Sequence, residues 1–204
     1  VWRGDTAETV ILGSAPTFHM LGLQASINTA AYLGATVVLL PRWEPQRALR
    51  LLKEHRVNRW GTSPAMLLDV LAMSELDASA FGSLTIINGG GAALPEAVNA
   101  RLESEFGIKF MESYGMTETA AMVLSNPIQG GKRQCLGIPT FGVSASVVDV
   151  DTLEPYEQGL ATETGELWIA GDQVSPFGYW KNPAANQECF VERDGRRWLR
   201  TGHL

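Results

Sequence analysis

A short segment, Glu112-Ser113-Tyr114-Gly115-Met116-Thr117-Glu118-Thr119, gathers side chains that can bind a nucleotide phosphate together with Mg²⁺. The Thr117 hydroxyl can donate a hydrogen bond to a phosphate oxygen, and the Glu118 carboxylate is the hard oxygen ligand that Mg²⁺ prefers. Tyr114 adds an aromatic face. Because a Thr-Glu pair also caps helices, the residues alone leave two interpretations open: a nucleotide site or a helix start.

A second segment, at residues 88–95, contains three consecutive glycines, Gly89, Gly90 and Gly91. Glycine lets a backbone come close to a flat ligand and exposes its N–H and C=O groups. Pro95 favours a helix start, and the N-terminus of a helix carries partial positive charge. A tight strand-to-helix turn has the same composition, so this loop taken alone indicates a turn at least as well as a binding site.

Strand-like and helix-like segments alternate before and between these two loops, which predicts an α/β fold. Expected strands lie at residues 10–15, 35–40, 57–62, 84–87 and 108–111, and expected helices at 21–33, 45–55, 64–76 and 95–106. The run at 35–40 has the composition of a buried strand. Alternation implies a parallel sheet flanked by helices, in which ligands bind beyond the carboxyl ends of the strands. Both loops are therefore expected at one edge of the sheet.

The pattern changes from about residue 135. Strand composition at 144–150 and 165–171, and an Asp194-Gly195 turn between apolar arms, predict a small antiparallel sheet or β-barrel-like subdomain. Proline and glycine cluster between Pro127 and Lys132. We therefore expect an α/β subdomain at residues 1–130 that carries both loops, and a β-barrel-like subdomain at 131–204.

Composition excludes several function classes. The net charge is -6 and the pI about 5.1, without a basic stripe, which argues against nucleic acid as a partner. No apolar run is long enough for a transmembrane segment. Cys135 and Cys189 match no metal spacing and indicate reduced thiols in a cytoplasmic protein. The chain starts at Val1, without a methionine or a signal-like segment, as expected for a piece of a longer protein.

Five motifs in order resemble those of the AMP-forming adenylate-forming enzymes: acyl-CoA synthetases, aryl-CoA ligases, beetle luciferases and peptide-synthetase adenylation domains. Tyr114-Gly115-Met116-Thr117-Glu118 is similar to the family's Tyr-Gly-x-Thr-Glu signature, and Gly90-Gly91-Ala92-Ala93-Leu94 to its Gly-Gly-Ala-Pro-Leu element. The others are Phe18-His19-Met20-Leu21-Gly22, the pair Gly165-Glu166-Leu167 and Gly178-Tyr179-Trp180, and Arg200-Thr201-Gly202. Together they cover nearly the whole chain.

The resemblance implies roles for individual residues. Tyr114 would stack on adenine, Thr117 would bind the phosphate that becomes the acyl-adenylate, and Glu118 would hold Mg²⁺; Thr117 and Glu118 are thus the implied catalytic pair. Further implied nucleotide contacts are Gly90, Gly91, Ala92, Gly115 and His203, and the implied acyl pocket is lined by His19, Gly89 and Gly90. The implied small molecules are ATP or AMP, Mg²⁺, coenzyme A and a carboxylic acid.

The family's reaction starts when a substrate carboxylate attacks the α-phosphorus of ATP and expels pyrophosphate; a thiol, usually coenzyme A, then attacks the acyl-adenylate. The phosphate loop and the C-terminal domain, each with a lysine, are expected outside this sequence, so the 204 residues alone are expected to be inactive. The family's ribose-binding aspartate is His203 here. One extra residue in Ser175-Pro176-Phe177 is expected to alter only a turn.

These features predict a ligase that joins a fatty or other apolar acid to coenzyme A. One alternative is an adenylation domain that serves a carrier protein. Another is a catalytically silent nucleotide- or acyl-binding module, which the histidine at position 203 motivates. Neither the individual acid nor the oligomeric state can be read from the residues.

Overall fold

The computed structural model describes residues 4–74, 76–157 and 164–204, which fall into two compact units. The first unit comprises Val1–Thr117 and Leu124–Ile138, and the second comprises Glu118–Val123 and Pro139–Leu204. The chain thus passes from the first unit to the second between Thr117 and Glu118. The predicted domain boundary after residue 130 stays a prediction.

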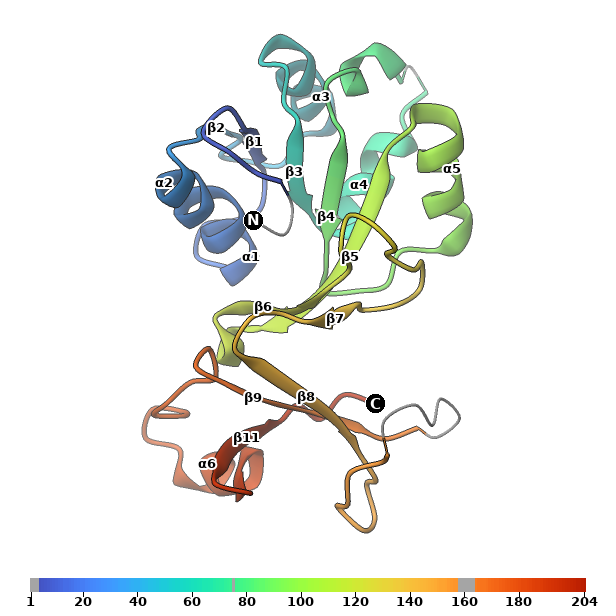
Figure 1. Cartoon of the computed structure of the whole chain (residues 1–204). Helices are drawn as coiled ribbons and strands as arrows, with labels where there is room; N and C mark the ends of the chain where they lie inside the picture. The colour runs from blue at the N-terminus through green and yellow to red at the C-terminus, as the bar shows by residue number, and fades with distance from the viewer. Residues whose placement is uncertain (1–3, 75, 158–163) are drawn as a thin grey trace. The chain divides into compact units, whose positions relative to one another are not determined.

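The first unit is built on parallel strands (Figure 1): β1 (Val10–Gly13), β2 (Thr36–Leu39), β3 (Arg59–Thr62), β4 (Ile86–Gly89) and β5 (Lys109–Met116). With β6 (Ala121–Ser125) and β7 (Ile138–Pro139), the strand order is β2-β1-β3-β4-β5-β6-β7. The predicted α/β class with a parallel sheet is confirmed.

Helices connect the parallel strands, close to the predicted positions. The first connection consists of α1 (Met20–Gly22), the π-helical segment η1 (Leu23–Asn28) and α2 (Thr29–Leu33), and ends at Gly34 with φ 68°. The others are α3 (Pro45–Glu54), α4 (Pro64–Leu71), the short 3₁₀ helix η2 (Ala78–Phe81) and α5 (Glu96–Phe106). Helix α4 ends before the predicted residue 76, because its last turn tightens.

The core of the first unit lies between the sheet and helices α3, α4 and α5. Trp60 on β3 is completely buried, and its indole Nε1 donates a hydrogen bond to Ser14 Oγ at 2.8 Å. Around it pack Leu52 from α3, Leu67 from α4 and Leu102 from α5. This packing fixes β3, β4 and β5 side by side and so determines where their carboxyl ends lie.

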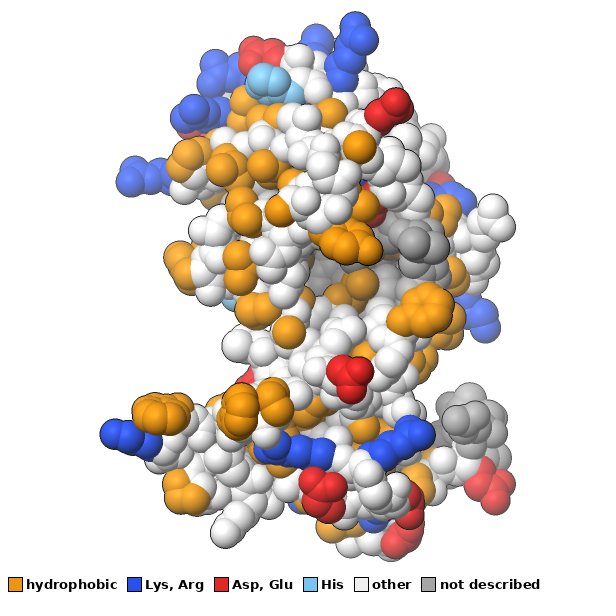
Figure 2. Space-filling view, turned by 60° about the vertical axis from the view of Figure 1, so that its left-hand side comes forward, with side chains coloured by type: hydrophobic (Ala, Val, Ile, Leu, Met, Phe, Trp, Pro, Cys, Tyr) orange, Lys and Arg blue, Asp and Glu red, His pale blue; other side chains and the backbone are white. Residues whose placement is uncertain are grey.

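Strand β2 is less buried than its composition predicts. It pairs with β1 and ends the sheet, and Leu39 is 50% exposed. Tyr32 and Phe18, from the connection before it, are also exposed. Figure 2 shows hydrophobic side chains gathered over this side of the first unit. The prediction of a buried strand at 35–40 was wrong, since an end strand has a sheet neighbour on one side alone.

The second unit contains the predicted antiparallel sheet. Its strands are β8 (Val143–Val148), β9 (Glu166–Gly171), β10 (Phe190–Arg193) and β11 (Arg196–Arg200), in the order β10-β11-β9-β8, with α6 (Pro183–Cys189) before β10. Asp194 and Gly195 join β10 to β11 with φ of 52° and 69°. Positive φ at both positions is the requirement of a two-residue hairpin turn, so this prediction is confirmed.

Within the described residues, no helix has both the length and the apolar character needed to cross a membrane. Cys135 and Cys189 are free thiols.

Candidate active site

The glycine loop and the Tyr114 segment meet at the carboxyl ends of β4 and β5. Gly89, the last residue of β4, lies opposite Glu112 on β5. One residue further on, the Ser113 hydroxyl donates a hydrogen bond to the Gly89 carbonyl at 3.0 Å. The loops that follow two neighbouring strands therefore share one edge of the sheet, as the alternation of elements predicts.

Close contact with residues of β5 explains two of the three glycines. A Cβ at Gly90 would lie 2.7 Å from the Ser113 carbonyl oxygen, and one at Gly89 would lie 2.1 Å from the Phe110 ring. Both distances are far below van der Waals contact. Gly91 differs, because its Cβ would meet open space while its φ of 84° favours glycine. The loop is thus held against β5 at Gly89 and Gly90 and exposed at Gly91.

Strand β5 continues further than predicted. Residues 112–116, expected as a loop, belong to the strand, and Thr117–Thr119 form a single 3₁₀ turn (η3) that leads into β6. No α-helix follows, so the structure does not support the helix-cap interpretation. Tyr114 is half-buried on this extension and Thr117 is exposed. The extension carries the motif beyond the end of β4, where its side chains reach solvent.

Glu112, which precedes the motif, is structural. It is 5% exposed, and its Oε2 accepts a hydrogen bond from the Cys135 backbone N–H at 3.1 Å. The Glu112 carbonyl accepts from the Asn126 N–H at 3.2 Å. This carboxylate therefore ties the loop after β6 to β5.

Glu118 begins the second unit and is held there at two points. The Tyr179 hydroxyl donates to Glu118 Oε1 at 2.7 Å, and the Ser175 backbone N–H donates to the Glu118 carbonyl at 2.7 Å. The hydrogen bond to Glu118, together with burial, raises the pKa of Tyr179, so the phenol stays protonated. The Ser175-Pro176-Phe177 segment, expected to alter only a turn, thus contacts the predicted metal ligand.

Glu166, in the Gly-Glu-Leu motif, has a role that the sequence does not reveal. It is 5% exposed. Its Oε2 accepts from Trp168 Nε1 at 2.9 Å and from Arg200 at 3.0 and 3.1 Å, while Oε1 accepts from the Gly202 N–H at 2.9 Å. Burial is the largest single influence and raises the pKa of Glu166, but the four hydrogen bonds and the Arg200 charge together lower it.

Replacing Glu166 with glutamine should destabilise the fold by about 3 kcal/mol, because an amide nitrogen must then face donors that a carboxylate satisfied. Since the pKa of Glu166 in the folded protein lies below the ordinary pKa of a glutamate, the stabilisation is present above that ordinary pKa and is lost as the pH falls through the folded-state pKa. Urea unfolding at several pH values measures both effects. Glu192→Gln, at an exposed position of β10, is the matched control; equal losses in the two variants would contradict the prediction.

His203 follows the segment that Glu166 holds. Its side chain is exposed, but its backbone is fixed: the Leu167 N–H donates to the His203 carbonyl at 2.9 Å, and the His203 N–H donates to Thr201 Oγ1 at 3.2 Å. A substitution here would therefore change the side chain without moving the chain. Its predicted contact with ribose stays a prediction.

His19 lies in the first unit and caps α1. Its side chain is exposed, and Nδ1 accepts a hydrogen bond from the Leu21 N–H at 3.1 Å. An accepting Nδ1 places the ring proton on Nε2, so that atom is the one able to donate to a substrate. The predicted role of His19 in an acyl pocket stays a prediction.

Glu118 suits Mg²⁺ bound together with a nucleotide. Among the residues that the structure describes, no three His, Cys, Asp or Glu side chains form a cluster able to hold a metal ion. Mg²⁺ at nucleotide sites is held by one or two carboxylates, with substrate phosphates and water completing the shell. The Tyr179 bond occupies Oε1 and does not use Oε2. The donor set therefore fits a nucleotide-dependent Mg²⁺ site and not a closed structural one.

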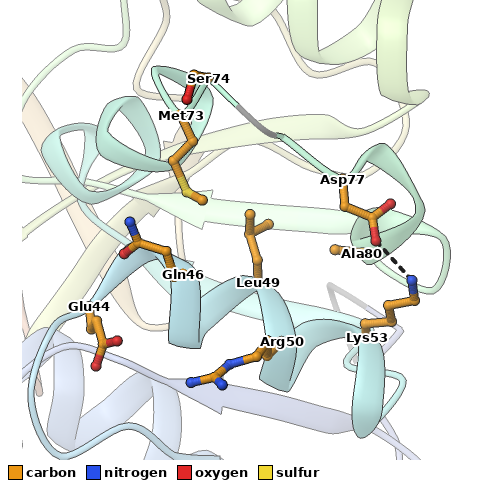
Figure 3. A pocket seen from close by; sticks show the side chains of 9 residues that line it. All are labelled: Glu44, Gln46, Leu49, Arg50, Lys53, Met73, Ser74, Asp77 and Ala80. Carbon is orange, nitrogen blue, oxygen red and sulfur yellow. Dashed lines mark hydrogen bonds and ion pairs between the residues drawn. The ribbon is translucent and has the colours of Figure 1, made fainter.

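The first unit also has a surface hollow of about 600 Å³, away from the sequence motifs. Figure 3 shows it between α3, the residues after α4, and η2, with the Lys53 ammonium 2.8 Å from Asp77 across one end. The hydrogen bond from Lys53, followed by bonds from Ser79, lowers the pKa of Asp77 to about 2. None of the nine lining residues belongs to the predicted site.

Comparison with protein-family models gives a match over residues 1–180 to the family described as AMP-binding enzyme. A long-chain-fatty-acid–CoA ligase of Bacillus subtilis is 32% identical over all of this chain and 35% of its own length. The 4-coumarate–CoA ligase-like 9 of Arabidopsis thaliana is 32% identical over 97% of this chain and 34% of its own length.

Solved structures agree with these matches. ATP-bound MatB from Rhodopseudomonas palustris is 27% identical and superimposes with a TM-score of 0.87, over 98% of this chain and 38% of that one. The chain therefore spans roughly a third of the length of the relatives that it matches.

Proposed function

Because this chain belongs to the AMP-binding enzyme family, we propose that it is part of an enzyme that activates a carboxylic acid as its acyl-adenylate and transfers the acyl group to coenzyme A. The Bacillus subtilis relative is named a CoA ligase and the Arabidopsis thaliana relative is named as like one, which supports this proposal. The observation that carries it is the contact between the glycine loop and the Tyr114 segment at the carboxyl ends of β4 and β5.

The proposed roles follow from the types of side chain. In the first unit, Tyr114 provides the aromatic face for adenine, and the exposed Thr117 hydroxyl is available to a phosphate oxygen. Gly90, with Gly91, Ala92 and Gly115, leaves room for backbone to approach the nucleotide. In the second unit, Glu118 is the Mg²⁺ ligand, and His203 stands at the position that would face ribose.

The chemistry requires a carboxylate oxygen to attack the α-phosphorus while pyrophosphate leaves. Bound Mg²⁺ would neutralise charge on the phosphate oxygens during this displacement. The residues of this chain contribute by positioning: Thr117 orients a phosphate oxygen, and the fixed backbone at Gly89 and Gly90 aligns the nucleotide with the acid. The acyl-adenylate then loses AMP when the thiol of coenzyme A attacks its carbonyl carbon.

We propose a fatty or other apolar acid as the substrate, with His19, Gly89 and Gly90 lining the acyl pocket. The names of the relatives, a long-chain fatty acid in one and 4-coumarate in the other, fit an acid with a large apolar part. The free thiols Cys135 and Cys189 fit a cytoplasmic enzyme, where thiols stay reduced.

Carboxylate-dependent ATP–pyrophosphate exchange tests the proposal. In the full-length polypeptide that carries this chain, exchange should require an acid and be strongest with fatty or aromatic acids; acids from acetate to long-chain fatty acids should be compared. Consumption of free coenzyme A would identify the ligase, whereas transfer only to a carrier protein would identify the alternative acceptor. The 204 residues by themselves are expected to give no exchange.

A second candidate function, a silent binding module, is favoured by His203. A neutral imidazole offers one acceptor where a carboxylate offers several, so ribose would be held less well. No exchange with any acid, from folded full-length protein that binds AMP, would support this candidate. Because the backbone at 203 is fixed, His203→Asp is the first substitution to make. If it restores pyrophosphate exchange, His203 is the cause of the missing activity.

A further inference from the structure

A tyrosine hydroxyl holds the carboxylate of Glu118 in the second unit. The Tyr179 hydroxyl donates to Glu118 Oε1 at 2.7 Å, and a hydrogen bond to a carboxylate is charge-assisted and about twice as strong as a neutral one. The Ser175 N–H fixes the Glu118 backbone from the same loop, at 2.7 Å. The backbone and the carboxylate of Glu118 are therefore both restrained by the segment from Ser175 to Tyr179.

Tyr179 is itself fixed. Asn186, on α6, accepts from the Tyr179 N–H at 2.6 Å and donates to the Tyr179 carbonyl at 3.0 Å, and the Tyr179 ring centroid lies 5.9 Å from that of Phe190. Gly178 makes this approach possible: its φ is 66°, and a Cβ there would lie 2.3 Å from Asn186 Oδ1. Hydrogen bonds with Asn186 and the ring contact with Phe190 thus fix the phenol of Tyr179, in addition to its bond with Glu118.

Comparison with Glu166 shows what a neutral donor achieves. Arg200 binds Glu166 and cancels its charge, as suits a buried structural carboxylate. Tyr179 contributes no charge to its bond with Glu118, because a phenol is a neutral hydrogen-bond donor. Glu118 is half-buried, and its bond with Tyr179 uses Oε1 and not Oε2. The carboxylate is therefore oriented while its negative charge remains available to a cation.

We infer that Tyr179 is a positioning residue. Its hydrogen bond with Glu118 fixes the orientation of the carboxylate that binds the metal ion on the nucleotide phosphates. This inference rests on the proposed function, since that function makes Glu118 the metal ligand. Without the hydroxyl, the glutamate side chain regains rotamers that do not face the metal. Groups that hydrogen-bond to a metal ligand typically account for about 10–100-fold in metal affinity.

The test measures how ATP affinity depends on Mg²⁺, by calorimetric titration of the full-length polypeptide. Tyr179→Phe keeps the ring and removes only the hydroxyl. We define the Mg²⁺ midpoint as the Mg²⁺ concentration at which the strengthening of ATP binding is half-maximal. The Tyr179→Phe change should raise this midpoint by about 10–100-fold. AMP binding without metal should not change. In a Glu118→Gln background, the same Tyr179→Phe change should have no further effect on the Mg²⁺ midpoint, because the carboxylate on which it acts is absent.

Tyr156 provides the matched control. Its hydroxyl also donates to a carboxylate in the second unit, Asp149 Oδ2, at 2.7 Å. Tyr156→Phe should leave the Mg²⁺ midpoint unchanged. The inference is overturned if Tyr179→Phe has the wild-type midpoint, if it shifts the midpoint equally in the Glu118→Gln background, or if it also weakens AMP binding, as a general structural role would.

Failure of the proposed function gives a different result. If the ATP affinity of the wild-type protein does not depend on Mg²⁺, the proposed metal role of Glu118 is wrong, and the inference about Tyr179 is wrong as well. If the wild type depends on Mg²⁺ and only the Tyr179→Phe result disagrees, the proposed function stands and the positioning role alone is refuted.

Discussion

Replacing Glu118 with alanine should lower the single-turnover rate of acyl-adenylate formation by about 10²–10³-fold, the usual cost of removing one group that stabilises charge in a transition state. The loss arises because Glu118 is the carboxylate proposed to hold Mg²⁺ on the phosphates. The measurement is a rapid-quench reaction with ATP and the best acid found by pyrophosphate exchange, using the full-length polypeptide.

Stability should change much less than the rate. Glu118 is half-buried and accepts one side-chain hydrogen bond, from the half-buried Tyr179, whose hydroxyl can turn to water once the carboxylate is removed. A cost of about 1 kcal/mol in the free energy of unfolding is expected. The matched variant is Glu118→Gln, which keeps an acceptor for Tyr179 but removes the charge. It should lose nearly as much rate and less stability.

Two results would remove Glu118 from the metal role. One is an unchanged single-turnover rate in the alanine variant. The other is a normal rate in Glu118→Gln beside a slow alanine variant, since that pair would show that shape and hydrogen bonding matter at this position and charge does not.

Local features of the sequence were sufficient wherever the structure depends on neighbours along the chain. The Asp194-Gly195 turn was predictable because two consecutive positive φ angles favour these residue types. Gly34 was predictable as the end of α2, because a helix commonly ends at a glycine with positive φ, here 68°. The order of strands and helices in the first unit followed from hydrophobic composition and from the prolines that begin α3 and α4.

The errors concern tertiary context. A strand of the composition of β2 can be central or terminal, and only the strand order shows that it ends the sheet. The extension of β5 through Met116 was missed because Ser113, Tyr114 and Gly115 are typical of a loop. Strand β4 ends opposite Glu112, whereas β5 also has β6 as a neighbour in the sheet, and β5 continues beyond the end of β4.

The candidate site shows the same division. The motifs mark Tyr114, Thr117 and Glu118 by type and spacing, but the partner of Glu118 lies 61 residues away and carries no local signal. Tyr179 could have been suspected only from its place in a Gly-Tyr-Trp segment. The distance that excludes a side chain at Gly90 likewise depends on a residue in the next strand, Ser113.

That distance leads to the second large effect. Gly90→Ala should reduce acid-dependent pyrophosphate exchange by about a hundredfold, because its Cβ would lie 2.7 Å from the Ser113 carbonyl oxygen. This oxygen belongs to β5 and cannot rotate away, so the glycine loop must move instead. A displacement of about 1 Å in a positioning element costs a reaction about 10²-fold. Overpacking of this kind also costs about 1–3 kcal/mol in the free energy of unfolding.

Gly91→Ala separates this contact from ordinary backbone strain. Gly91 has φ 84° and open space around its Cβ, so alanine there should cost about 1 kcal/mol of strain without pushing the loop from β5. If the loop acts by its fixed distance from β5, exchange falls far more in the Gly90 variant than in the Gly91 variant, at temperatures where both are folded. Equal losses would mean that flexibility of the loop matters and its contact with Ser113 does not. A fully active Gly90→Ala protein would show that the nucleotide does not depend on this edge of the sheet, and would remove the observation on which the proposed function rests.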